Sequence, residues 1–209
     1  MPGKTIKSIE RFLSALVKRY DEVDARREEA IRVNRDLLRH STNAIFELTR
    51  GSCGRGLREL RRARRCLRRA LEIVSSVPEE ERQHIIRVLG DGLREFVEGA
   101  LLYQYVCGRK LRGFDLEELS LLNPSSVIEG IFDFIGELRR IFLEKLIGGD
   151  VREASKYLED MREMYNMLAR LNIKDYYLPS LKRRLDILRS QIDKSMEDLH
   201  VALARGQGR

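Results

Sequence analysis

Residues 181–203 read LKRRLDILRSQIDKSMEDLHVAL, and this stretch decides the fold class. Its apolar side chains recur at intervals of four, three, four, four, three and four residues, so on an α-helix they form one continuous stripe. The stripe consists of Leu181, Leu185, Leu188, Ile192, Met196, Leu199 and Leu203. The stretch therefore predicts a long amphipathic helix that lays one face on a core.

Helical spacing of this kind continues through the rest of the chain, whereas runs that alternate like a β-strand are almost absent. Glycine and proline punctuation separates the helical segments. We expect long helices over about 5–50, 55–74, 79–107, 124–148, 150–171 and 179–203. The chain is thus predicted to be all-α, with one helical domain over residues 1–204 and a flexible tail over 205–209.

Length and composition narrow the class of protein. The chain has 209 residues, of which 43% are hydrophobic, so a disordered chain is excluded. No apolar run approaches the roughly 18 residues needed to span a membrane, and charges throughout the first 20 residues exclude a signal peptide. Three cysteines are too few and too scattered for a disulfide framework or a metal knuckle. These features predict a soluble, cytoplasmic protein.

The excess positive charge is concentrated in one segment. The chain has 40 Lys and Arg against 33 Asp and Glu, a net charge of +7, and residues 55–69 hold eight arginines and only Glu59 as an acid. That segment alone accounts for +7, because the remaining 32 basic and 32 acidic residues balance. Such a stripe fits either a phosphate backbone or ion pairs with neighbouring helices or subunits. Charge alone leaves both interpretations open.

Two acid pairs have helical spacing. Glu95 and Glu98 are three residues apart, and Asp133 and Glu137 are four apart, so each pair projects from one face of its helix. Carboxylates that converge from two helices can hold a divalent ion, although acids at these spacings also occur on most solvated helices. Glu98 stands out because it lies in the almost wholly apolar run 96–107, where a buried carboxylate needs a compensating partner.

These residues resemble the translin superfamily, specifically its TRAX (translin-associated factor X) branch. The segment Glu95-Phe-Val-Glu98-Gly99 is similar to the E-[YF]-V-E-A signature of that branch, with glycine in place of alanine. Asp133-Phe-Ile-Gly-Glu137-Leu138 is similar to its D-x-x-G-E-L signature, and a Gly149-Asp150 break follows. The resemblance extends over about residues 20–203.

The resemblance implies a bundle of six to seven helices, the seventh being a short one over 115–122. It implies a metal-dependent endoribonuclease that binds and cleaves single-stranded RNA, with Mg²⁺ or Mn²⁺ as cofactor. The catalytic and metal-ligating residues would be Glu95, Glu98, Asp133 and Glu137. The family also implies an oligomeric shell, an octamer, formed as a homo-oligomer or together with a separate translin-like subunit.

Four further arginines are candidate contacts to the nucleic-acid backbone: Arg27, Arg32, Arg35 and Arg87. Two alternatives remain open. The chain could be a non-catalytic, translin-like protein that binds RNA or single-stranded DNA, or a structural helical scaffold. If the four acids form an open, mutually repelling cluster, Asp133→Asn is expected to stabilise the metal-free protein slightly.

Overall fold

The computed structural model of the protein describes residues 2–206, with side chains from 3 to 204. Helices occupy most of this range, which contains no strand, so the all-α class is confirmed. The elements are α1 (Pro2–Thr49), α2 (Cys53–Ser75), the 3₁₀ turn η1 (Glu79–Glu81), α3 (Arg82–Val88), α4 (Gly90–Cys107), α5 (Leu116–Leu122), α6 (Pro124–Ile147), α7 (Val151–Ala169) and α8 (Leu181–Gly206).

The prediction of a single helix over 79–107 was wrong, because the chain forms η1, α3 and α4 there. The break lies at Leu89, whose amide bonds to the carbonyl of Ile86 in a tightened turn. Gly90 and Gly92 follow, and glycine has a low helix propensity. The break brings the number of helices within residues 2–206 above the six or seven expected.

Several helix ends agree with their predicted caps. The side chain of Asn123 accepts from the amide of Ser126 at the start of α6, whose first residue is Pro124. Asp150 caps α7 by accepting from the amide of Glu153. The short α5 was also expected. Helix α8 continues to Gly206, into the segment predicted as a tail, and 207–209 lie outside the described residues.

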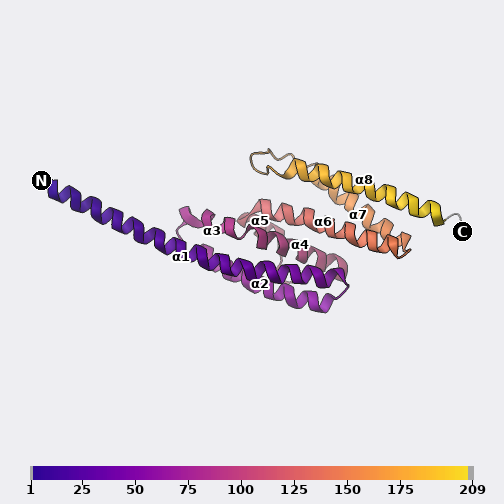
Figure 1. Cartoon of the computed structure of the whole chain (residues 1–209), viewed down its shortest axis with the longest axis horizontal. Coiled ribbons are helices and arrows are strands. Elements are labelled where there is room, and N and C mark those ends of the chain that lie inside the picture. Colours follow the sequence, from indigo (N-terminus) through magenta and orange to yellow (C-terminus); the bar gives the residue numbers. More distant parts are fainter. Residues whose placement is uncertain (1, 207–209) are drawn as a thin grey trace.

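The helices form a stack in which each packs mainly on its neighbours (Figure 1). Helix α2 lies along α1 at one edge, α4 packs on both, α6 packs on α4, and α7 and α8 lie beyond α6. The first third of α1 projects away from the stack (Figure 1). No helix within residues 2–206 has the length and apolar character to cross a membrane.

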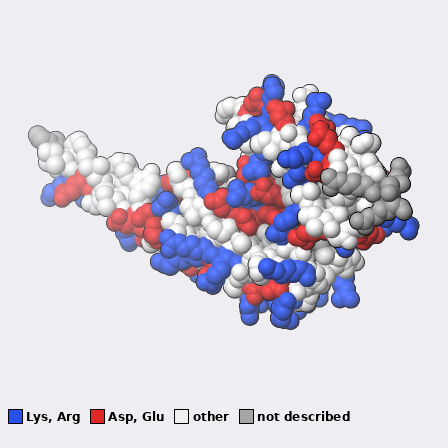
Figure 2. Space-filling view, turned by 45° about the vertical axis from the view of Figure 1, so that its right-hand side comes forward, with Lys and Arg blue, Asp and Glu red and all other residues white. Residues whose placement is uncertain are grey.

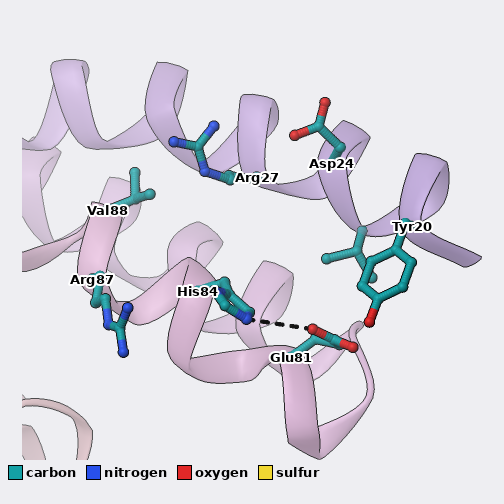
Figure 3. Close-up of a pocket in the computed structure, with 8 residues that line it drawn as sticks. Tyr20, Asp24, Arg27, Glu81, His84, Arg87 and Val88 are labelled. Atoms are coloured by element: carbon teal, nitrogen blue, oxygen red, sulfur yellow. Dashed lines mark ion pairs between the residues drawn. The ribbon is translucent and has the colours of Figure 1, made fainter.

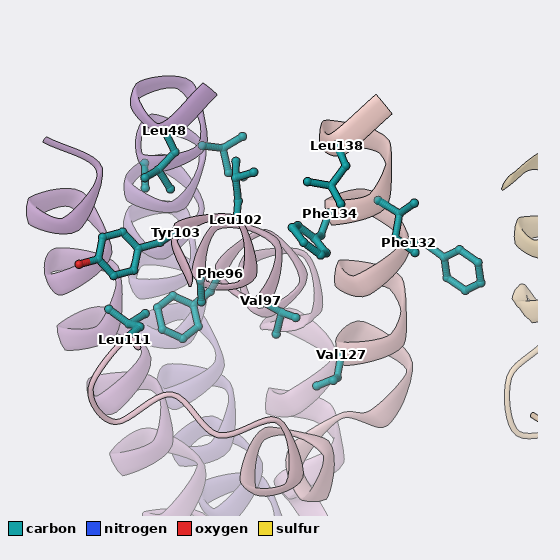
Figure 4. Packing of buried hydrophobic residues seen from close by; sticks show 14 of the residues in the cluster. Leu48, Phe96, Val97, Leu102, Tyr103, Leu111, Val127, Phe132, Phe134 and Leu138 are labelled. Carbon is teal, nitrogen blue, oxygen red and sulfur yellow. The ribbon is translucent and has the colours of Figure 1, made fainter. Parts of the chain in front are cut away.

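The core is largest where α1, α4 and α6 meet. Phe96 and Leu102 of α4 lie between Leu48 of α1 and the pair Phe134 and Leu138 of α6 (Figure 4), and all five are at most 5% exposed. Burial of each such side chain stabilises the fold by about 1.5–3 kcal/mol. This packing fixes α4 against α6, the two helices that carry the acid pairs.

A disulfide corrects the expectation drawn from the scattered cysteines. Cys53, at the start of α2, is bonded to Cys107, at the end of α4, 54 residues away. The two come together only through the packing of α4 on α1 and α2, which residue spacing does not reveal. The bond ties the helix that carries Glu95 and Glu98 to the turn between α1 and α2.

Candidate functional site

A pocket of about 580 Å³ opens between α4, α6 and α8. Helices α4 and α6 approach closely because Gly130 has no side chain: a Cβ atom there would lie 2.6 Å from the carbonyl oxygen of Arg94. Helix α8 lines another side of the pocket with Arg184, Leu188 and Gln191. Figure 2 shows acidic side chains gathered in a hollow on this face of the molecule.

All four predicted acids line this pocket, so the structure brings the two pairs together from two helices. Glu95 and Glu98 come from α4, and Asp133 and Glu137 come from α6. A fifth acid, Glu129, lies one turn before Asp133 and lines the same pocket. The helical spacing of 129, 133 and 137 could have identified it.

Glu98 is the most deeply buried of these acids, with 7% of its surface exposed. Burial and, after it, the neighbouring charges of Glu95, Asp133 and Glu137 together raise the pKa of its carboxyl to about 8, with Arg94 opposing the shift. The described residues include no hydrogen-bond or ion-pair partner for it at close range. The described residues therefore do not supply the compensating partner that the apolar surroundings of Glu98 call for.

Glu137 and Glu95 stand beside Glu98. Burial is the main reason that the pKa of Glu137 is raised, and Arg140 opposes this shift. The Arg140 guanidinium lies 2.9 Å from Glu137 Oε2, but the atoms are not aligned for a hydrogen bond, so that buried oxygen lacks one. Glu95 accepts a hydrogen bond of 3.1 Å from Thr42 of α1.

Asp133 has different electrostatic surroundings, because two arginines contact its carboxylate. Arg184 of α8 donates to Asp133 Oδ1 at 2.9 Å, and Arg94 of α4 lies 3.3 Å from the other oxygen. The same arginines lie 3.8 and 3.9 Å from Glu129, which also accepts a hydrogen bond from Ser180. Two acids and two arginines thus form a neutral network at this end of the pocket.

Ion pairs with arginines affect which of the four carboxylates are available to bind a metal ion. Within the described residues, no three acidic, histidine or cysteine side chains lie close enough together to hold an ion. Carboxylate oxygens suit Mg²⁺ or Mn²⁺, and the uncompensated charge around Glu98 fits a cation. Asp133 is shared with Arg94 and Arg184, and sequence spacing could not reveal Arg184 because it comes from a distant helix.

The four predicted phosphate-contacting arginines separate into two groups. Arg27 of α1 and Arg87 of α3 line one groove of about 570 Å³, together with Tyr20 and His84 (Figure 3). Glu81 also lies there, 3.6 Å from the His84 ring, and is held by a 3.1 Å hydrogen bond from Arg19. Arg32 and Arg35 are exposed on α1 but do not line this groove.

Comparisons with known proteins agree with this architecture. The model of the Translin family matches residues 25–202. An uncharacterized protein of Methanocaldococcus jannaschii is 26% identical over 189 residues, covering 90% of this chain and 81% of the relative.

Solved structures are similar over nearly the whole chain. The structure of an AfC3PO–duplex RNA complex has a TM-score of 0.81 and 28% identity, covering 94% of this chain and 99% of the other. A crystal structure of AfC3PO has a TM-score of 0.80 and 29% identity, covering 92% and 97%. The fold, the acid-lined pocket and the family match lead to one conclusion: this chain belongs to the Translin family.

Proposed function

We propose that the chain is a TRAX-like subunit: a Mg²⁺- or Mn²⁺-dependent endoribonuclease that binds and cleaves single-stranded RNA. The observation that carries the proposal is Glu98, buried among three further carboxylates with a pKa raised to about 8. A buried carboxylate without a partner is unfavourable for folding, so a site that keeps one has a use for its charge. A divalent cation is the partner that such a cluster fits best.

The four acids Glu95, Glu98, Asp133 and Glu137 would hold the ion. When bound, it would lower the pKa of a water molecule and stabilise negative charge at the scissile phosphodiester. Thr42 orients Glu95 from the neighbouring helix, so that carboxylate is placed to hold or orient the attacking water. Arg183, exposed at the same pocket, supplies positive charge for the phosphate backbone.

RNA binding is supported by two observations. The groove that contains Arg27, His84 and Arg87 places two guanidiniums and a ring nitrogen around one hollow, with Tyr20 available for stacking on a base. The similar AfC3PO structure contains duplex RNA. Arg32 and Arg35, exposed on the same helix as Arg27, would extend the contacts along the backbone.

We also propose that the chain assembles into a homo-oligomeric shell, an octamer, in which a separate translin-like subunit could take part. Large apolar side chains are exposed on the projecting part of α1, among them Ile6, Phe12 and Val17, each more than half exposed. Exposed apolar surface of this extent is typical of subunit contacts. Light scattering of the purified chain measures the mass, and a monomer would contradict the shell.

A second candidate function is RNA or single-stranded DNA binding without cleavage. The observation that favours it is the neutral network of Asp133, Glu129, Arg94 and Arg184, which occupies a predicted metal ligand with arginines. The same experiment tests both functions, because they differ only in cleavage.

The test is cleavage of labelled single-stranded and duplex RNA with Mg²⁺, with Mn²⁺ and with EDTA. The Glu98→Ala variant is compared with Glu163→Ala, which removes an exposed glutamate from α7. We expect metal-dependent cleavage that falls at least about 100-fold in Glu98→Ala and is unchanged in Glu163→Ala. RNA binding without cleavage by the folded wild type would favour the second candidate.

A further inference from the structure

Both oxygens of the Asp133 carboxylate have a cationic neighbour. Arg184 of α8 donates a hydrogen bond of 2.9 Å from Nη1 to Oδ1. Arg94 Nε of α4 lies 3.3 Å from Oδ2, but it is not aligned for a hydrogen bond and is buried without an acceptor. Arg184 is therefore the residue that holds Asp133 in place through a hydrogen bond.

This hydrogen bond competes with the binding of a cation at Asp133. It uses one carboxylate oxygen, and the positive charge of Arg184 repels a cation placed beside that oxygen. In the arrangement described for residues 3–204, no three acidic, histidine or cysteine side chains are close enough to hold an ion. Asp133 is therefore free to act as a ligand, together with the three other predicted acids, once Arg184 has moved away.

Glu129 offers Arg184 a second partner. It lies one turn before Asp133 on α6, and its Oε2 is 3.8 Å from Arg184 Nη2. The hydroxyl of Ser180, at the start of α8, donates a hydrogen bond of 3.1 Å to Glu129 Oε1, so this carboxylate is held beside the helix that carries Arg184. A rotation of the Arg184 side chain would exchange the hydrogen bond to Asp133 for one to Glu129.

The surroundings of Arg184 permit such a rotation. Its side chain is 26% exposed and lines the pocket of about 580 Å³, so it is not enclosed by the core. The guanidinium lies 6.0 Å from the centroid of the Phe132 ring, an aromatic face that favours a cation. Because an acid lies within reach at both ends of the movement, the charge of Arg184 is never left without a partner.

We propose that Arg184 is a positioning residue that shifts from Asp133 to Glu129 when a divalent cation binds, and that it thereby sets the metal affinity of the acid-lined pocket. This inference rests on the proposed metal-dependent function and names the residue that controls metal binding. Since Arg184 belongs to α8 whereas the acids belong to α4 and α6, the metal site is coupled to the position of α8. The ion pair at Asp133 is then a part of the metal site.

The experiment measures the affinity of the full chain for Mn²⁺ by isothermal titration calorimetry, without RNA, after metal has been removed with EDTA and the EDTA by dialysis. Wild type is compared with Arg184→Gln, Glu129→Gln and the double variant. Arg189→Gln is the control for loss of charge, because it removes an exposed arginine of α8 that does not line the pocket. Glutamine keeps a helix propensity close to that of arginine and glutamate.

The variants should change the affinity for Mn²⁺ in opposite directions. Arg184→Gln should bind about 10-fold more tightly than wild type, because Asp133 no longer has a competing hydrogen bond. Glu129→Gln should bind roughly 3-fold more weakly, because Arg184 then has no second partner and stays on Asp133. In the Arg184→Gln background, Glu129→Gln should change the affinity by less than about 2-fold, and Arg189→Gln should stay within about 2-fold of wild type.

The outcomes distinguish this inference from the proposed function. If neither wild type nor Arg184→Gln binds Mn²⁺, the metal-dependent function itself is overturned. If wild type binds Mn²⁺ and Arg184→Gln binds it equally or more weakly, only the inference is overturned, because the hydrogen bond would then orient Asp133 as a ligand. Equal effects of Glu129→Gln in both backgrounds would overturn the shift as well, since Glu129 would then act through its charge alone.

Circular dichroism establishes that Arg184→Gln is folded. If it is not, Glu129→Gln carries the test in comparison with Glu163→Gln, which removes an exposed glutamate of α7. Weaker binding of Mn²⁺ is then expected in Glu129→Gln alone, and equal affinities in the two variants overturn the inference.

Discussion

The two ends of the acidic pocket carry the same kind of side chain in different electrostatic states. At one end, Asp133 and Glu129 lie among Arg94 and Arg184, so their charges are neutralised. At the other end, Glu98 is buried with acids for neighbours, and the pKa of its carboxyl rises to about 8. Helical spacing makes these acids look equivalent. The partners that come from other helices make them different.

This electrostatic difference means that the acids at the two ends of the pocket affect the stability of the fold in opposite ways. A neutralised pair contributes to the fold, whereas an uncompensated carboxylate opposes folding until a cation or a proton neutralises it. In the metal-free protein, substitutions at the two ends should therefore change stability in opposite directions.

The largest change in stability is expected from the titration of Glu98 as the pH changes. Its ordinary pKa is 4.5 and its pKa in the folded protein is about 8, so between these values the unfolded state has released a proton that the folded state still holds. Stability must then fall as the pH rises from about 5 to 8, by up to about 1.4 kcal/mol per pH unit, and the loss stops above pH 8.

Urea unfolding at pH 5, 6, 7 and 8 in EDTA measures this slope, in wild type and in Glu98→Gln. The variant cannot ionise at this position, so it should lose less stability than wild type over the same range. Equal losses in the two proteins would mean that Glu98 ionises as freely when folded as when unfolded.

The sequence predicted the fold class, most helix ends and the meeting of the acid pairs, because these follow from apolar periodicity and caps. Pro124 and Asp150 began or capped helices as expected, and Glu98 is buried as its apolar run indicated. What could not be predicted depends on contacts between segments far apart in the chain. Arg184 lies 51 residues from Asp133, and Cys53 lies 54 residues from Cys107.

The arginine segment shows the same limit. Its charge was evident, but which of its arginines form ion pairs depends on where the acids of α1 lie: Arg55 pairs with Glu47 and Arg69 pairs with Glu29. Glu29 and Glu47 are the partners, and Arg69 is the main reason that the pKa of Glu29 is lowered. Arg55 and Arg69 are separated by two intervals of seven residues, so they lie on one face of α2, the face toward these acids.

Asp133→Asn is expected to change the stability of the metal-free protein by a smaller amount. An open acid cluster would make this substitution stabilising, but the arginine contacts seen in the structure should make it destabilising. The substitution weakens the contacts of 2.9 and 3.3 Å with Arg184 and Arg94, so it should destabilise the metal-free protein by about 1–2 kcal/mol. Glu129→Gln is the matched control, because it removes one charge from the same arginines at 3.8 and 3.9 Å.

Thermal or urea unfolding at pH 7 in EDTA measures both variants. Asp133→Asn should be destabilised more than Glu129→Gln. If Asp133→Asn is instead more stable than wild type, repulsion from Glu98 outweighs the two arginines, and the two ends of the pocket are not electrostatically distinct.

The smallest change in the stability of the metal-free protein is expected at Glu137, which is partly buried like Glu98 and also lies beside an arginine like Asp133. Its pKa is raised mainly by burial, while Arg140, about half exposed, opposes the shift. Because Arg140 is about half exposed, its pair with Glu137 on the same helix contributes only about 0.3–0.5 kcal/mol. Glu137→Gln should therefore stabilise the metal-free protein, by less than Glu98→Gln does at pH 8.

Arg140→Gln should destabilise the metal-free protein slightly, because Glu137 then loses the only cation that lies within 4 Å of it among the described residues. Urea unfolding of both variants at pH 8 in EDTA compares them. If Glu137→Gln also destabilises the protein, the pair with Arg140 outweighs the burial of the carboxylate, and Glu137 belongs with the neutralised acids.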